Sequence, residues 1–393
     1  MLVSGRRSSS PVHFVNPGKI GIYGFGALVV TFYELLRGDY IIGKGNSLTT
    51  SAFRENPVLR SKRHDKDQIE EEDITDNFFK DLVESYKSGS LPEVVIVAPN
   101  PDRLMGFTQD FVNYIEFLVK EHILDTEKTV PVFVIASNGI FDGEFREQLG
   151  RALADSTILD GSSLKVKQKL MGRIIRMTAY QAGKREGTGG KAIYEVMPKG
   201  NAAIAGGEAS VRKRLKDILL ERGYPDIEDA GNSAERIEFI KAIYNLMANA
   251  ALLAFIVDEK GKPRHLITGN ILPDSKSCIK DVSCFAHSLG GAAFNIGKRR
   301  GLFPKEERFD YILEKHIYPV LKKYEYVPHS SLQLFHQKLR DRVLEERLLP
   351  LEENLVSTLV YIAEKEKMRE EKEVLLQLQT MILNCFHRAN YLL

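Results

Sequence analysis

The sequence predicts an α/β protein in two parts: an N-terminal parallel sheet covered by helices, followed by an all-helical C-terminal domain. The chain has 393 residues, more than one hydrophobic core usually serves, so more than one domain is expected. Short apolar strands alternate with helical segments in the first half, which is typical of a parallel sheet with helices on both faces. After about residue 235 the apolar spacing becomes continuously helical. We therefore expect domains at 17–232 and 233–340 and a helical C-terminal extension at 341–393.

The predicted strands are short apolar runs bounded by glycine, proline or polar residues. The first strand, residues 20–23, passes through glycines into a helix whose apolar positions include Phe32 and Leu36. Further strands are expected at 39–43, 94–98 and 132–136, and extended segments at 192–197 and 202–205 are expected to close the same sheet.

Composition narrows the class of protein. The residues are 43% hydrophobic and 27% charged, as in ordinary globular chains. The formal net charge of +2 disfavours a broad basic surface for nucleic acid, and no stretch has the roughly 20 apolar residues of a membrane span. The three cysteines do not have the spacing of a disulfide framework or a zinc site, and the N-terminus lacks the apolar core of a signal peptide. We expect a cytoplasmic protein that acts on a small molecule, without metal, nucleic acid or membrane; its apolar C-terminal segment is compatible with a homodimer.

A glycine turn lies where the first strand passes into the first helix. In Gly24-Phe25-Gly26, the first glycine permits a sharp turn and the second lets the backbone approach a pyrophosphate at the helix N-terminus. The third position of the G-x-G-x-x-G fingerprint is Val29, whose branched side chain is expected to hold helix and strand further apart. This placement favours a Rossmann-type dinucleotide-binding domain over an ordinary structural turn. The residues expected at the cofactor are Gly24, Phe25, Gly26, Ala27 and Leu28.

The end of the second predicted strand bears on which dinucleotide binds. Folds that prefer NAD carry an acidic residue there for the ribose hydroxyls, whereas this chain has Lys44 and no carboxylate between residues 42 and 46. Lys44 could pair with a 2′-phosphate, so the sequence predicts NADP (NADPH) as the cofactor. The alternative is that Lys44 is a surface lysine in a loop.

Three polar residues form a stripe on an otherwise apolar helix after residue 236. Lys241, Asn245 and Asn249 are spaced by four, so they share one face of an α-helix. Burying an amine and two amides without partners is costly, so each needs a partner. One alternative is a buried carboxylate for Lys241 and interhelical bridges for the asparagines. The other is a ligand between the domains, with a protonated Lys241 donating a proton to a substrate carbonyl and Asn245 and Asn249 orienting the substrate.

Taken together, these residues resemble the ketopantoate reductase family, within the wider group of 6-phosphogluconate-dehydrogenase-like enzymes. The resemblance rests on the glycine turn, on Lys44-Gly45 in place of an Arg-Gly pair, on Ser137-Asn138-Gly139, on the Lys241 stripe, and on residues 309–312 and 327–335. It implies a Rossmann domain, a helical domain and NADPH-dependent reduction of a small 2-keto acid between them. It also implies that Asn138 lies beside the nicotinamide and that Lys241, Asn245 and Asn249 are catalytic.

The chain departs from the family pattern at several positions. Besides Val29, the family's substrate-binding glutamate falls on Arg308, with Glu307 adjacent, and its active-site serine corresponds to Ser283 or Ser288. Glu307 and Ser288 are therefore the candidate substrate-binding residues, and the residues after about 340 extend beyond the resemblance. Two alternatives stay open: a non-catalytic dinucleotide-binding or scaffolding protein, and an opine- or polyol-type dehydrogenase.

Overall fold

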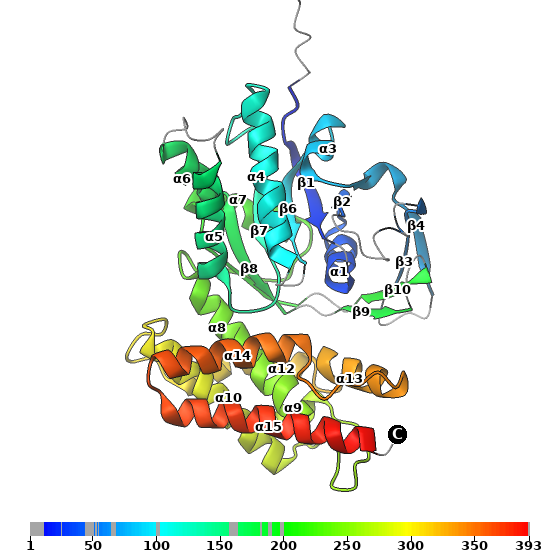
Figure 1. Ribbon diagram of the computed structural model, residues 1–393, viewed down its shortest axis with the longest axis vertical. Coiled ribbons are helices and arrows are strands. Elements are labelled where there is room, and N and C mark those ends of the chain that lie inside the picture. Colours follow the sequence, from blue (N-terminus) through cyan, green and yellow to red (C-terminus); the bar gives the residue numbers. More distant parts are fainter. Residues whose placement is uncertain are drawn as a thin grey trace, which may run out of the picture.

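A computed structural model gives the architecture of the protein (Figure 1). The structure describes residues 12–24, 26–43, 51, 53, 55–63, 68–99, 103–156, 164–180, 183–187, 191–196 and 200–391. In Figure 1 the strands lie in the N-terminal half and the C-terminal half is helical and stacked below it. Within the described ranges, no helix has the length and apolar character needed to cross a membrane.

The main sheet confirms the predicted parallel architecture. Its strands run in the order β12-β11-β8-β7-β6-β1-β2-β5, and all neighbours are parallel except β8 and β11. Since the carboxyl ends of β1, β6, β7 and β8 meet at one edge, the turns that follow them lie together. The strands are β1 (Asn16–Tyr23), β2 (Tyr40–Ile42), β5 (Phe78–Phe79), β6 (Pro92–Val97), β7 (Val132–Ile135), β8 (Ile174–Ala179), β11 (Ala202–Ala205) and β12 (Ile227–Asp229).

Helices cover both faces of this sheet because its strands are apolar on both sides. In β6, Val94 and Ile96 belong to one buried cluster, while Val95 and Val97 belong to the opposite one. The first cluster includes α1 (Ala27–Leu36) and α7 (Ala209–Glu221). The helices of the second cluster are α3 (Leu82–Lys87), α4 (Leu104–Lys120), α5 (Asp142–Asp155) and α6 (Leu164–Gly172).

A second sheet corrects one prediction. Residues 202–205 join the main sheet as β11, but β10 (Ile193–Val196), within the segment expected to do the same, belongs to a separate sheet of order β4-β3-β10-β9. The reason is that β10 lies against α1, where Tyr194 is fully buried, so its apolar face is satisfied by the helix. The other strands are β3 (Val58–Arg63), β4 (Glu70–Asp73) and β9 (Gly183–Glu186).

The helical half has one continuous core. Its buried residues extend from Phe239 to Ala389, so the last two helices complete the core that the first one begins. The first helix, α8 (Ala234–Asn245), continues through a π-helical turn, Leu246–Ala250, into α9 (Ala251–Leu253). The remaining helices are α10 (Lys280–Arg299), α11 (Phe309–Ile312), α12 (Tyr318–Lys323), α13 (Ser330–Arg340), α14 (Pro350–Lys365) and α15 (Arg369–Tyr391).

Candidate active site

The glycine turn joins β1 to α1 as the sequence predicts. Gly24 has a φ of 115°, a conformation that favours glycine, and a Cβ there would lie 3.3 Å from both the Pro99 backbone nitrogen and the Val29 side chain. Val29 is buried in the core, so its branched side chain is accommodated beside the bare Gly24 backbone. At the start of α1, Gly26, Ala27 and Leu28 are half-buried and the first turn carries no acidic residue. This geometry suits an anion at the helix N-terminus; Phe25 and Lys44 lie outside the described residues.

The loop after β7 is fixed by a buried ion pair between the two halves. Arg176, on β8, donates from Nε to Glu238 Oε1 at 2.6 Å, and both side chains are almost fully buried. Arg176 also donates to the Gly139 carbonyl, while Glu238 accepts from the backbone nitrogens of Phe141 and Asp142. Burial raises the pKa of Glu238, whereas the guanidinium and the backbone N–H groups favour its ionised form. The loop carrying Asn138 is therefore held against α8, which carries Lys241.

The predicted polar stripe exists and is buried. Lys241, Asn245 and Asn249 are 8%, 6% and 3% exposed. Asn249 Nδ2 donates to Asn245 Oδ1 at 3.3 Å, and Asn249 Oδ1 has no hydrogen-bond partner among the described residues. Asn249 lies in the π-helical turn, a local irregularity that is frequent at functional sites. The asparagines therefore pair with each other on one helix and leave an acceptor oxygen unused.

Lys241 is surrounded by aromatic rings. Its Nζ lies 4.3 Å from the centre of the Tyr180 ring and 4.5 Å from that of Tyr244, contacts that favour a cation. Nevertheless, burial lowers the pKa of Lys241 to about 7, and no carboxylate in the described part of the chain counters this. The described residues therefore contain no buried carboxylate partner for Lys241, which was one of the two alternatives for this lysine.

A buried histidine, His329, lies near Lys241 and directly precedes a residue that lines a cavity. The His329 ring packs edge-on against Tyr244, with 5.6 Å between ring centres. Burial, and secondarily the charge of Lys241, lowers the pKa of His329 to about 3, so the imidazole is neutral near pH 7. The next residue, Ser330, lines the cavity. The residues that line this cavity do not include Lys241, Asn245 or Asn249, so His329 and Tyr244 separate the buried amine from its wall.

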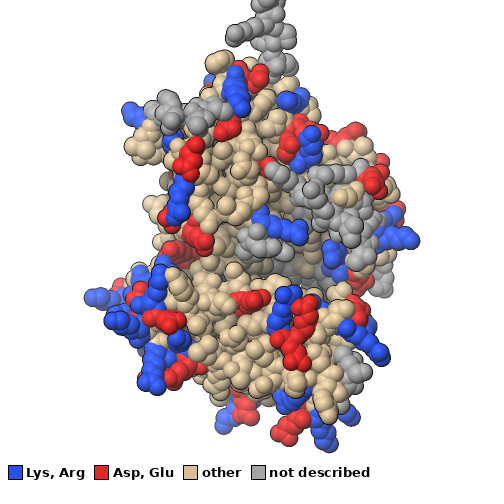
Figure 2. All heavy atoms as spheres, in the orientation of Figure 1, with Lys and Arg blue, Asp and Glu red and all other residues tan. Residues whose placement is uncertain are grey.

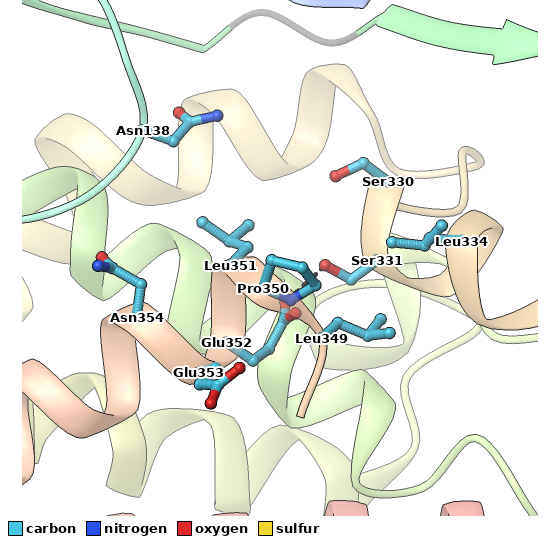
Figure 3. Close-up of a pocket in the computed structure, with 10 residues that line it drawn as sticks. All are labelled: Asn138, Ser330, Ser331, Leu334, Leu349, Pro350, Leu351, Glu352, Glu353 and Asn354. Carbon is cyan, nitrogen blue, oxygen red and sulfur yellow. Dashed lines mark hydrogen bonds between the residues drawn. The ribbon is translucent and has the colours of Figure 1, made fainter. Parts of the chain in front are cut away.

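The cavity has a volume of about 590 Å³ and lies between the two halves (Figure 3). Figure 3 shows Asn138 and Asn354 on one side and Ser330, Ser331 and Leu334 on the other, with the start of α14 between them. The loop that carries Asn138 and helix α14 approach closely, since a Cβ on Gly139 would lie 2.9 Å from Asn354 Oδ1. The face drawn in Figure 2 is hollowed between the halves and carries interspersed acidic and basic side chains.

The two candidate substrate-binding residues, Glu307 and Ser288, are not among the residues that line this cavity. Glu307 is held by Arg236 through paired contacts of 2.7 Å, so its carboxylate is already neutralised. Ser288 is exposed on α10, because it points away from the face that packs into the core. Ser283, the other serine considered, donates its hydroxyl proton to the Ile271 carbonyl.

The structure adds residues that the sequence prediction missed. Glu352 is 1% exposed and lines the cavity, and it shares a helix face with the apolar residues Leu355, Val356 and Leu359. That pattern of a charge in register with apolar positions is the signal that identified Lys241, and it could have identified Glu352. Likewise, Arg176 in an apolar strand could have signalled a buried partner, although its identity depends on the fold.

The fold and the site define a class: an α/β protein with a glycine turn after its first strand, a helical C-terminal half and a buried lysine in the first helix of that half. No family model and no curated protein matches the sequence. The solved structures of similar fold include D-mandelate dehydrogenase with NADH and anilino(oxo)acetate, with a TM-score of 0.62, 12% identity and coverage of 95% of this chain and 99% of that one.

Ketopantoate reductases are similar in the same way. The Ralstonia eutropha enzyme of the PanE/ApbA family has a TM-score of 0.57 at 12% identity, covering 93% of this chain and 99% of that one. A 2-dehydropantoate 2-reductase from Methylococcus capsulatus has a TM-score of 0.56 at 15% identity, covering 93% and 97%. The resemblance read from the sequence is thus confirmed as a likeness of fold: this chain has the ketopantoate reductase fold in a divergent sequence.

Proposed function

We propose that this protein is an NAD(P)-dependent oxidoreductase that reduces a small 2-keto acid, with NADPH preferred. The observation that carries the proposal is the Lys241 amine, buried without a carboxylate partner in the described residues, on the helix against which the Asn138 loop is held. The similar folds support it, because their solved structures are named as D-mandelate dehydrogenases and ketopantoate reductases, and two contain NADH.

The residues present fit a dinucleotide at the glycine turn and a small acid in the cavity. The uncharged start of α1 would hold the pyrophosphate, and Asn138 would orient the nicotinamide, which supplies a hydride to the substrate carbonyl carbon. Lys241 in its ammonium form would hydrogen-bond the carbonyl oxygen and release one proton to it as the alcohol forms. Asn245 and Asn249 would orient the substrate, Asn249 through the oxygen that has no partner among the described residues, and the apolar surroundings would exclude water.

Turnover of 2-keto acids with NADPH and NADH tests this proposal. Wild type is expected to oxidise NADPH at 340 nm with at least one acid from a panel with alkyl, hydroxyalkyl and aryl side chains. Lys241→Ala should lose at least about a hundredfold in kcat while still binding NADPH, whereas the exposed control Lys365→Ala should behave as wild type. NADPH binding without turnover of any acid would favour the scaffolding alternative.

The NADPH preference is assigned to Lys44. Lys44→Ala should weaken NADPH binding about tenfold or more and leave NADH binding nearly unchanged, because only NADPH carries the 2′-phosphate that a lysine can pair with. Fluorescence titration of both nucleotides measures this. Equal effects on the two nucleotides, or tighter NADH binding by wild type, would contradict the assignment.

A further inference from the structure

Glu352 stands out among the buried groups that the proposed proton transfer does not use. It lies in the first turn of α14, after Pro350, and its side chain is almost fully buried. Oε1 accepts a hydrogen bond of 2.5 Å from the Ser331 hydroxyl, whereas Oε2 has no partner among the described residues. A buried carboxyl oxygen without a hydrogen-bond partner is unfavourable. A ligand that hydrogen-bonds to Oε2 would account for this position.

The surroundings favour the protonated form of this carboxyl group. Burial raises the pKa of Glu352 to about 7, against the opposing effects of the Ser331 hydroxyl and the backbone N–H of Glu352 itself. No cationic side chain of the described residues takes part, and an ionised carboxylate without a counter-charge is strongly disfavoured in a buried site. When protonated on Oε2, Glu352 becomes a hydrogen-bond donor.

The position of Glu352 relates it to the proposed reaction. It lines the same cavity as Asn138, and Figure 3 shows it meeting Ser331 between α13 and α14. The π-helical turn that carries Asn249 packs against both α13 and α14. Two buried oxygens that have no partner among the described residues, on Asn249 and on Glu352, therefore belong to elements that pack together.

We propose that Glu352 is a substrate-binding residue, whose protonated Oε2 donates a hydrogen bond to an acceptor oxygen of the 2-keto acid in the cavity. This inference rests on the proposed function for its substrate class. It assigns part of the specificity to α14, outside the helix that carries the Lys241 stripe. An ionised Glu352 would instead repel an anionic acid, so neutrality is part of the recognition.

Substrate binding in the absence of turnover tests this role directly. The protein saturated with NADP⁺ cannot reduce a keto acid, so calorimetric titration with the same 2-keto acid panel measures binding alone. Glu352→Leu, an apolar replacement of similar size, should weaken binding of the best acid about tenfold, the usual effect of losing one buried hydrogen bond. Glu352→Gln keeps a neutral N–H donor and should bind within about threefold of wild type. Glu364→Leu, an exposed change on the same helix, is the matched control.

The outcomes separate the two proposals. Unchanged binding by Glu352→Leu would mean that Oε2 faces only water or packing and would overturn the role of Glu352. A loss in Glu352→Gln as large as in Glu352→Leu would overturn the neutral-donor form. If wild type binds an acid but never reduces it, the proposed reaction is rejected, while the comparison of the Glu352 variants still tests the binding role. If wild type binds none of the acids, the proposed reaction and the role of Glu352 are both overturned. Thermal melting of each variant checks that it folds.

Discussion

The low pKa of Lys241 makes a specific prediction for the pH dependence of the reaction. Burial lowers this pKa from 10.5 to about 7, and the proposed reduction needs the protonated amine. At pH 8 about a tenth of the lysine is protonated and at pH 9 about a hundredth, so kcat should fall about tenfold per pH unit above 7. A lysine with its ordinary pKa would stay more than about 95% protonated at pH 9 and give a constant kcat.

The assay is steady-state reduction from pH 5.5 to 9 at saturating keto acid and NADPH. Saturation matters because Glu352, whose pKa is also near 7, is expected to act through substrate binding and hence through KM. His329 is neutral throughout this range because its pKa is about 3. The reverse oxidation needs the neutral amine as a base and should rise with pH through the same value. A kcat for reduction that stays constant between pH 7 and 9 would refute the assignment of Lys241 as a proton donor of lowered pKa.

The same shift in pKa should appear in the stability of the protein. Between pH 7 and 10.5 the unfolded lysine holds a proton that the folded lysine has lost, so the free energy of unfolding should increase as pH rises through this window. The two pKa values bound the gain at ~5 kcal/mol, at about 1.4 kcal/mol per pH unit. Urea denaturation of wild type and Lys241→Met at pH 7 and 9.5 measures it, since the variant lacks the effect. A difference between the two proteins that does not change with pH would contradict the burial of a titrating amine.

Two further predictions concern the scaffold around the site. Arg176→Met leaves the Glu238 carboxyl buried without its cation and should lower the free energy of unfolding, measured by urea denaturation, by about 3 kcal/mol or more. Adding Glu238→Gln should restore part of that loss. Equal losses in the single and double variants would argue against a coupled pair. Gly24→Ala places a Cβ in close contact with neighbouring atoms at a φ of 115° and should weaken NADPH binding at least tenfold. The control Gly150→Ala, in a helix with open space around it, should bind NADPH as wild type does and gain up to about 1 kcal/mol of stability. Normal NADPH binding by Gly24→Ala would mean that the cofactor does not bind at this turn.

Local patterns in the sequence were enough to predict the parallel sheet, the glycine turn and the polar stripe. Each depends on spacing within one or two elements, as with Lys241, Asn245 and Asn249 on one helix face. The partner strand of residues 193–196 could not be read in this way, because an extended segment does not specify which edge it joins.

The missed site residues depend on contacts between distant parts of the chain. Arg176 and Glu238 are 62 positions apart, and Ser331 and Glu352 are 21 apart, so only the tertiary fold brings each pair together. Glu307 and Ser288 were chosen by their order along the family pattern. Their actual partners and exposure follow from how α10 and α8 pack, which the order of residues does not encode.

The shared core of the helical half has a consequence for how the protein is made. On α15, Cys385 donates to the Ala254 carbonyl beyond α9, and α14 and α15 pack on α10. The N-terminal half can therefore fold while the ribosome is still translating, but the helical half must wait for α14 and α15. Until then the apolar helices of this half lack their covering partners, so the cavity wall that Glu352 lines is completed late in folding.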